Sequence, residues 1–379
     1  MSSTAATPST LGPSASTRDA APSARETDPV MEPLVEMPRG SGPPATAERP
    51  EAPEDDAPYG EPRLWSIPSN PVPPGTRVAV LEVDGLRLRY ALFRPASAGA
   101  GKRGRGTIVL LQGRNEYIEK YFETARDLAA RGFMVMTFDW RGQGGSERLL
   151  PDPQRGYVRS FRDYERDLDA MIERVVLPDC RAPFTIVGHS TGALIALLAA
   201  SRHRNRIERI VALAPMLRLT NQPLGPAAIR WITGFLRLVG LGKRYVALGR
   251  RAREVPDYLS NVLTTDRTRH ERNGAMLVEH YHLGLGGPTV TWLHAASRAM
   301  RRCLRERHLR TVSIPSLMIV AGDDMVVSNR AIEAAARGMR NSNVVTVDGA
   351  RHELLQERDR YRGQVLAAIE AFAAKPFDG

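Results

Sequence analysis

Short, nearly continuous apolar runs recur along the chain and are separated by stretches with helical spacing, such as 117–131 and 160–176. Such runs predict strands that are buried on both faces of a parallel sheet, with helices between them. A hairpin precedes the series, because two strand-like segments flank Asp84-Gly85. The pattern therefore indicates a mostly parallel α/β fold with helices on both faces. The expected strands are 77–83, 86–93, 107–111, 133–138, 184–187, 209–213, 316–320 and 344–347.

The alternation of strands and helices is interrupted between about residue 215 and residue 310. This interval has helical spacing, many arginines and several aromatic residues, among them Trp231 and Phe235, but no buried-strand pattern. An insertion at this point of the chain lies over the C-terminal edge of the sheet, where ligands bind in open α/β folds. We therefore expect a helical cap at about 215–310.

Residues 1–60 differ in composition from the rest of the chain. Pro, Ala, Ser, Thr, Gly and acidic residues dominate, which predicts a disordered tail before one catalytic domain over residues 61–379. The tail holds four Arg and ten acidic residues, a net charge of −6, so the total of +11 leaves +17 on the domain. A basic domain favours anionic partners such as an acidic lipid surface, or it simply has a solvated basic surface. No basic motif interleaved with aromatic residues indicates nucleic acid.

The two cysteines, Cys180 and Cys303, show neither metal-ligand spacing nor a disulfide framework, which is typical of a reducing compartment. The first residues lack the charged and apolar regions of a signal peptide. No window holds the roughly 18 consecutive apolar residues that a membrane-spanning helix needs. We expect a cytoplasmic protein that can contact the inner face of the membrane without crossing it.

One apolar run leads directly into Gly188-His189-Ser190-Thr191-Gly192, and an Ala/Leu-rich run follows it. Strand, turn and helix in this order fit the G-x-S-x-G nucleophile elbow, in which a strained turn presents a serine hydroxyl at the sheet edge. Side chains at Gly188 and Gly192 would collide with the helix and the neighbouring strand. Ser190 is therefore the candidate nucleophile, and the alternative is a serine that only caps the helix.

A serine nucleophile needs a base to take its proton and a carboxylate to orient that base. On this scaffold the acid and then the histidine follow the serine, each just after a late strand. The run at 316–320 leads into Asp323 and Asp324, and the run at 344–347 leads into His352. His352 is the candidate base and one of the two aspartates is the candidate acid. The alternative is a polar residue at a helix start and an aspartate pair in a simple turn.

The tetrahedral intermediate of ester hydrolysis needs two N–H donors. One is expected from the backbone of Thr191, directly after the nucleophile, and the other from the loop after the first parallel strand. In that loop Gly113 permits a close approach of the backbone, and the N–H of Arg114 is the candidate donor, although Arg114 can also be an ordinary loop residue. This chemistry implies no cofactor and no metal.

These motifs together resemble the α/β-hydrolase serine esterases that include monoacylglycerol lipases, and most closely the bacterial lysophospholipases of that group. The resemblance covers about residues 65–375, and it implies that Asp324 rather than Asp323 is the acid. It also implies that Glu116 and Lys120 line the polar-head side of the site. Many lipases have His-Gly where this chain has Gln112-Gly113, a change that keeps the backbone donor and alters the polar contacts of the loop. The matching segments are QGRNEYIEKY (112–121), FDWRGQGGS (138–146), LLPDP (149–153), GHSTG (188–192), LTTDRTRHERN (263–273), GGPTVTW (286–292), AGDDMVV (321–327) and GARHELL (349–355).

We therefore expect a serine carboxylester hydrolase that cleaves a lipid with a single acyl chain and shelters that chain under the cap. Two basic clusters and the resemblance favour a lysophospholipid, although the same arginines can merely solvate helix faces. A monoacylglycerol lipase or general carboxylesterase is the alternative. A peptidase on this fold would need a charged pocket for an amine, and a non-catalytic binding protein would have lost part of the Ser-His-Asp set. The clusters are Lys243, Arg244, Arg250, Arg251 and Arg253, then Arg298, Arg301, Arg302, Arg305 and Arg307.

Overall fold

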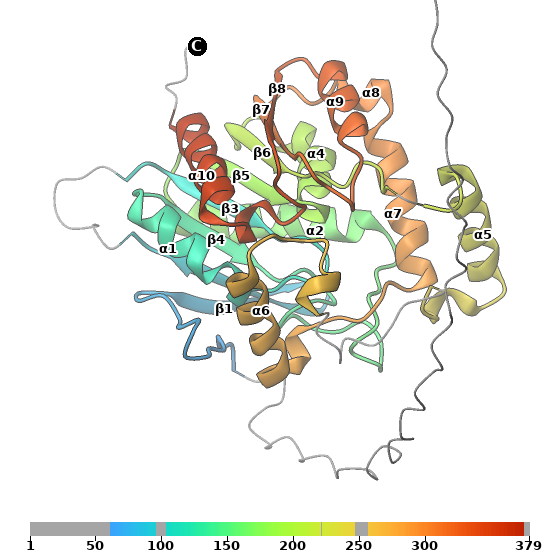
Figure 1. Ribbon diagram of the computed structural model, residues 1–379, viewed down its shortest axis with the longest axis horizontal. Coiled ribbons are helices and arrows are strands. Elements are labelled where there is room, and N and C mark those ends of the chain that lie inside the picture. The colour runs from blue at the N-terminus through green and yellow to red at the C-terminus, as the bar shows by residue number, and fades with distance from the viewer. Residues whose placement is uncertain (1–60, 96–103, 221, 247–256, 375–379) are drawn as a thin grey trace, which may run out of the picture. The chain divides into compact units, whose positions relative to one another are not determined.

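The computed structural model describes residues 61–95, 104–220, 222–246 and 257–374. Within these residues eight strands form one sheet in the order β1-β2-β4-β3-β5-β6-β7-β8 (Figure 1). The predicted tail lies outside the described residues, as do Arg250, Arg251 and Arg253 of the predicted cap. The strands are β1 (Arg77–Val83), β2 (Leu86–Phe93), β3 (Thr107–Leu111), β4 (Met134–Phe138), β5 (Phe184–His189), β6 (Arg209–Leu213), β7 (Ser316–Ala321) and β8 (Ser342–Val347).

The sheet is parallel from β4 to β8, and the N-terminal hairpin joins it through an antiparallel pairing of β2 with β4. Asp84 and Gly85 both have positive φ, as a tight hairpin turn requires. Every residue of β3 to β7 is buried, because helices cover both faces there. β8 is the edge strand, and its central residues are exposed. The predicted α/β fold is confirmed.

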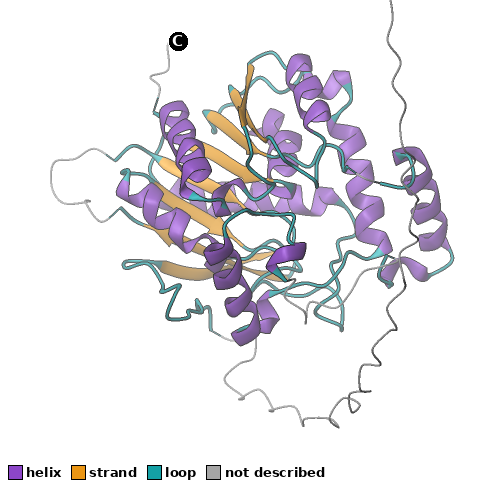
Figure 2. Cartoon of the chain, in the orientation of Figure 1, coloured by secondary structure: helices purple, strands orange, loops and turns teal. Residues whose placement is uncertain are grey.

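Helices on the two faces of the sheet bury its apolar side chains (Figure 2). α1 (Phe122–Ala130) and α10 (Asp359–Ala373) lie on one face, while α2 (Phe161–Met171) and α4 (Thr191–His203) lie on the other (Figure 1). α9 (Asn329–Gly338) packs against β7 and β8. The predicted helix at 160–176 consists of α2 and a π-helical segment over Ile172–Val176.

The interval 215–310 is helical within its described residues. Its first long helix, α5 (Pro226–Leu238), packs against α7 (Val290–Cys303), and α7 packs in turn against α4 and α2. Trp292 and Cys303 of α7 belong to the main hydrophobic core, so this end of the insertion is continuous with the body of the fold. The remaining elements are η4 (Leu241–Lys243), η5 (Tyr258–Ser260), α6 (Arg267–Glu279), η6 (Tyr281–Leu283) and α8 (Glu306–Leu309).

Parallel strands bring the loops at their carboxyl ends to one edge of the sheet. The loops that follow β3, β5, β7 and β8 carry Arg114, Ser190, Asp324 and His352 respectively. The topology therefore gathers candidate residues that are far apart in the sequence.

Candidate active site

Ser190 lies in a strained turn between β5 and α4. Its backbone has φ 50° and ψ −107°, a conformation that non-glycine residues rarely adopt. The two neighbouring glycines make the turn possible. A Cβ on Gly188 would lie 2.7 Å from the Cα of Ala193 in α4, and one on Gly192 would lie 2.4 Å from the carbonyl oxygen of Leu111 in β3. The turn thus requires glycine against the helix on one side and the neighbouring strand on the other.

A chain of two hydrogen bonds joins Ser190, His352 and Asp324. His352 Nε2 lies 3.0 Å from Ser190 Oγ, and His352 Nδ1 lies 2.8 Å from Asp324 Oδ2. All three side chains are buried or nearly so. The structure brings Asp324 rather than Asp323 to the histidine, since the side chain of Asp323 is exposed to solvent.

The second oxygen of Asp324 is fixed by its own loop. Asp324 Oδ1 accepts hydrogen bonds from the backbone N–H groups of Val326, at 2.8 Å, and Val327, at 2.9 Å. Burial opposes the charge of this carboxylate, but the His352 contact and the two N–H donors outweigh it and hold the pKa of Asp324 below its usual value. An ionised Asp324 keeps the proton of His352 on Nδ1 and leaves the Nε2 lone pair facing Ser190.

The loop after β3 runs directly beside the N-terminus of α4. The carbonyl oxygens of Leu111 and Gln112 lie against Gly192, and Trp140 Nε1 holds the Gln112 carbonyl at 2.9 Å. The backbone N–H groups of Arg114 and Thr191 donate to no acceptor within the part of the chain that the structure describes. Two free N–H groups and a helix N-terminus suit stabilisation of an oxyanion.

Glu116 and Lys120 form a buried network behind this loop. The Glu116 carboxylate accepts from the N–H of Gly113 and, at 2.6 Å, from the hydroxyl of Tyr121. Lys120 Nζ lies 3.1 Å from Glu116 and 2.6 Å from Glu353. Burial opposes the charge of Glu116, but Lys120 and nearby His189 hold its pKa well below the usual range. These contacts are within the protein, so a role of Glu116 and Lys120 toward a lipid headgroup stays a prediction.

His189, which the sequence reasoning did not single out, connects this network to the candidate base. Its Nδ1 lies 3.1 Å from Glu116 Oε2, and its Nε2 lies 3.1 Å from the carbonyl oxygen of His352. Burial disfavours a charged imidazole, but the Glu116 carboxylate prevails and raises the pKa of His189. Both ring nitrogens face acceptors, which suits the doubly protonated form. His189 occupies a variable position of the G-x-S-x-G motif, so no motif signal marks it.

Comparisons with known proteins show the family of the chain. The family model described as "Serine aminopeptidase, S33" matches residues 102–359. The probable lysophospholipase L2 of Haemophilus influenzae is 30% identical over 288 residues, which cover 76% of the chain and 88% of that protein. The chain belongs to this α/β-hydrolase family.

A second curated relative and a solved structure agree with the family membership of this hydrolase. Lysophospholipase L2 of Escherichia coli (strain K12) is 32% identical over 305 residues, covering 76% of the chain and 85% of that protein. A soluble variant of monoglyceride lipase from Saccharomyces cerevisiae, solved with a substrate analog, has a TM-score of 0.63 at 19% identity, covering 79% of the hydrolase and 95% of that structure. The latter likeness shows the shared fold. The expectation of a carboxylic ester hydrolase is confirmed.

Arg114 of the hydrolase is a half-buried cation with few partners. Its Nη2 donates to the carbonyl oxygen of Gly286, and its guanidinium carbon lies 5.4 Å from the centre of the Trp292 ring. Among the described residues its buried Nε has no hydrogen-bond partner, and no carboxylate pairs with the guanidinium. Burial lowers the pKa of Arg114 to about 10. A guanidinium in these surroundings favours the approach of an anionic group.

The described ranges of the hydrolase contain neither a metal-ligand cluster nor a helix that could span a membrane. No group of three His, Cys, Asp or Glu side chains there is arranged to hold a metal ion. No helix in the same ranges is long and apolar enough to span a bilayer.

Proposed function

We propose that this hydrolase cleaves the single carboxylic ester of a lysophospholipid, with Ser190 as the nucleophile. Its Oγ attacks the ester carbonyl carbon while His352 Nε2 takes the hydroxyl proton. Collapse of the tetrahedral intermediate breaks the bond to the glycerol oxygen, which takes that proton from Nε2. Water then attacks the acyl-enzyme and gives a proton to Nε2, and the second intermediate collapses by breaking the bond to Ser190 Oγ, which takes that proton back as the fatty acid leaves. The hydrogen-bonded chain from Ser190 through His352 to Asp324 is the observation that carries this proposal.

In both tetrahedral intermediates the former carbonyl oxygen of the ester carries a negative charge, which must be stabilised by hydrogen-bond donors. The N–H groups of Arg114 and Thr191 are the proposed donors to it. Their position beside Ser190 supports this role, since Thr191 begins α4 and the loop of Arg114 packs against Gly192. Removing one such donor in other acyl-transfer enzymes costs about 100- to 1,000-fold in turnover.

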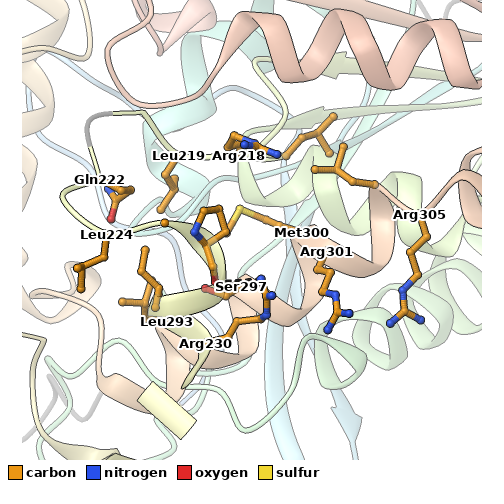
Figure 3. A pocket seen from close by; sticks show the side chains of 15 residues that line it. Arg218, Leu219, Gln222, Leu224, Arg230, Leu293, Ser297, Met300, Arg301 and Arg305 are labelled. Atoms are coloured by element: carbon orange, nitrogen blue, oxygen red, sulfur yellow. Dashed lines mark hydrogen bonds between the residues drawn. The ribbon is translucent and has the colours of Figure 1, made fainter. Parts of the chain in front are cut away.

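A cavity of about 520 Å³ between α5 and α7 is the proposed acyl-chain site. This volume falls in the range of about 300–1,000 Å³ that is usual for small-molecule sites. Figure 3 shows Leu219, Leu224 and Leu293 at one end of the cavity, with Arg301 and Arg305 at the other.

The chain itself links this cavity to the nucleophile. Leu217 lines the cavity and directly follows Met216. The N–H of Met216 donates to the carbonyl oxygen of Ser190 at 3.0 Å, and its sulfur lies 3.7 Å from the hydroxyl oxygen of Thr191. The lining of the cavity is thus one residue along the chain from a residue that contacts the nucleophile loop, which supports the assignment.

The headgroup preference rests on Arg114. A monoacylglycerol offers no anion, whereas a lysophospholipid carries a phosphate a few bonds from the scissile ester. The guanidinium of Arg114 sits in the same loop as the proposed oxyanion donor and has no carboxylate partner among the described residues. A phosphate would supply the missing hydrogen-bond acceptor, and guanidinium recognises phosphate in a bidentate manner.

The test compares lysophosphatidylglycerol, lysophosphatidylethanolamine, monoacylglycerol and a p-nitrophenyl butyrate control in the wild type and in Arg114→Gln. Because the backbone N–H at position 114 is kept, we expect the aryl ester to be hydrolysed at a near-normal rate. Hydrolysis of the two lysophospholipids should fall at least about tenfold in kcat/KM, as loss of a charge-assisted hydrogen bond predicts. Equal cleavage of monoacylglycerol and lysophospholipid by the wild type would instead indicate a monoacylglycerol lipase or general esterase.

A further inference from the structure

The two edge strands of the sheet differ in how their open sides are protected. β1 carries Arg77 and Glu82, and the carbonyl oxygen of Glu82 accepts a hydrogen bond from Arg174 at 2.8 Å. Charged residues and a covering side chain are common protection of an edge strand against another chain. β8 has the sequence SNVVTV, without charge or proline, and pairs with β7 along its whole length without a bulge. Figure 1 shows these two strands at opposite ends of the sheet.

The centre of β8 is open to solvent on both faces. All residues from 343 to 346 are exposed, although side chains along a strand alternate between the faces of the sheet. The helices α9 and α10, which pack against β8, therefore do not cover the strand to its edge. Val344 and Val345 are 37% and 42% exposed. An uncovered strand with β-branched side chains is a template for pairing with a further strand.

The hydrogen bonds at the two ends of β8 show which of its main-chain groups are unpaired. The N–H of Ser316 donates to the carbonyl oxygen of Asn341 at 2.8 Å. The N–H of Gly322 donates to the carbonyl oxygen of Val347 at 3.0 Å. In a parallel strand the N–H and C=O of one residue point to the same side and those of its neighbours to the opposite side, so the odd-numbered residues of β8 face β7. The even-numbered residues direct both groups outward, where nothing bonds to them in the part of the chain that the structure describes. These outward-facing residues are Ser342, Val344 and Thr346.

We propose that β8 pairs with β8 of a second copy of the chain, so that two molecules of the hydrolase form a symmetric dimer with one continuous sheet. Antiparallel pairing across a two-fold axis is self-complementary. When the Val344 residues of the two copies lie opposite each other, Ser342 lies opposite Thr346. All outward-facing residues then exchange both of their hydrogen bonds. A register moved by two residues leaves Ser342 or Thr346 beyond the end of the partner strand.

Charged residues at the two ends of β8 support the same register. Arg340 precedes the strand and Asp348 follows it, and both are exposed. Among the described residues neither forms a salt bridge. In the register centred on Val344, Arg340 of one copy lies opposite Asp348 of the other, and opposite charges therefore meet at both ends of the pair. This complementarity favours a second copy of the chain as the occupant of the edge.

The segment 1–60 is the alternative occupant from within the chain. Proline recurs along this segment, and a proline cannot supply the N–H that a strand needs in a ladder. Its net charge of −6 also has no counterpart in the uncharged sequence of β8. The second copy offers an unbroken strand with matching charges, which the segment 1–60 does not.

Antiparallel pairing leaves both candidate active sites open. Each site lies at the carboxyl end of the parallel strands, and the two-fold axis reverses the strand direction from one copy to the other. The two sites therefore face opposite ends of the joined sheet, and neither copy covers the site of the other. The dimer does not rest on the proposed function.

Sedimentation velocity of the full chain, from low to high micromolar concentration, measures the dissociation constant of the dimer. Val344→Pro should raise this constant at least about tenfold, because it removes an outward N–H and leaves the hydrogen bonds to β7 in place. Val344→Lys should raise it at least as much, since two ammonium groups then meet at the two-fold axis. The matched control is Val72→Lys, because Val72 is also 37% exposed but precedes β1 at the other edge of the sheet. It should leave the constant unchanged.

A charge exchange and a cross-link test the register. Arg340→Asp and Asp348→Arg should each raise the dissociation constant about fivefold, because like charges then meet at both ends of the pair. The double variant exchanges the two charges and should regain the wild-type constant. Val344→Cys should form an intermolecular disulfide on mild oxidation, since the Cα atoms of a hydrogen-bonded antiparallel pair lie about 5.5 Å apart. The wild type, which has only Cys180 and Cys303, is the control for this oxidation.

Hydrogen exchange of the full chain identifies what covers the edge. Protection of residues 342–347 that rises with protein concentration supports the dimer. Protection that is independent of concentration overturns it in favour of a segment of the same chain, and a monomer without protection overturns it outright. A dimer whose dissociation constant is unchanged in Val344→Pro and Val344→Lys overturns β8 as the interface.

Failure of this proposal is distinguishable from failure of the proposed function. Ser190→Ala should dimerise like the wild type, because the candidate nucleophile lies away from β8. Val344→Lys should hydrolyse p-nitrophenyl butyrate like the wild type while it sediments as a monomer. Loss of the dimer in Ser190→Ala would contradict the β8 interface, whatever the substrate of the hydrolase.

Discussion

Replacing Asp324 by Asn forces the wrong tautomer on His352, and the structure says why. The Oδ1 atom of Asp324 accepts from the N–H groups of Val326 and Val327, so that position must remain an oxygen. The amide NH₂ of the asparagine is then compelled to face His352 Nδ1, where Oδ2 now accepts at 2.8 Å. A donor opposite Nδ1 makes it an acceptor and moves the imidazole proton to Nε2. The N–H then points at Ser190, and the base is lost.

The size of the effect follows from this geometry. The side chain of Asn has the same shape as that of Asp, so the packing around this buried site survives and the loss falls on chemistry. A triad with the wrong tautomer loses about four orders of magnitude in turnover, which corresponds to about 5 kcal/mol of transition-state stabilisation. KM for a short ester should change little, because no contact to substrate is removed.

The assay is the initial rate of p-nitrophenyl butyrate hydrolysis, with circular dichroism as the check on folding. Asp323→Asn is the matched control, since Asp323 is the exposed neighbour, and surface changes of this kind stay within about twofold. The reasoning is refuted if Asp323→Asn loses more activity than Asp324→Asn, or if Asp324→Asn remains within about 100-fold of the wild type, far above the expected rate.

Three further predictions concern the nucleophile and base, the buried network and the tail. Ser190→Ala and His352→Ala should each lower turnover by about a millionfold with the fold intact, and a fluorophosphonate probe should label Ser190, whereas labelling of another serine contradicts the elbow assignment. Glu116→Gln should destabilise the protein by about 3–5 kcal/mol in urea unfolding at pH 7, because two cationic partners remain buried. The lowered pKa of Glu116 stabilises the fold above its unfolded value near 4.5 and ceases to do so as the pH falls through the folded value, so the difference should narrow in acid. Removal of residues 1–60 should leave Tm and esterase activity unchanged, and a much lower Tm would show that the tail packs.

Most of the sheet could be predicted because the central strands are buried on both faces, which leaves near-continuous apolar runs in the sequence. The limits of this signal appear where burial is partial. β8 begins at Ser342, earlier than its apolar run, because an edge strand tolerates polar residues on its open side. The helical spacing over about 215–310 indicated helices but not their neighbours, so the sequence could not show that α7 joins the main core.

Most of the candidate site could be predicted from the sequence for a related reason. Ser190 and His352 follow strands that the pattern located, so chain order alone pointed to them. Spacing did not separate Asp323 from Asp324, because adjacent residues of a loop point in different directions and only the resemblance chose between them. The role of His189 could not be predicted from the sequence. Its contacts with Glu116 and the His352 carbonyl join the end of β5 to two separate loops, which meet only in the folded chain.

Two proposed tasks of the loop after β3 fall to different atoms of one residue, Arg114. The proposed oxyanion donor at position 114 is a main-chain N–H, which every amino acid except proline supplies, whereas the guanidinium is particular to arginine. If the guanidinium selects the headgroup as proposed, a substitution at this position changes which lipids are accepted while the main-chain donor persists. On this proposal, related hydrolases could diverge in lipid preference through a single codon without passing through an inactive intermediate.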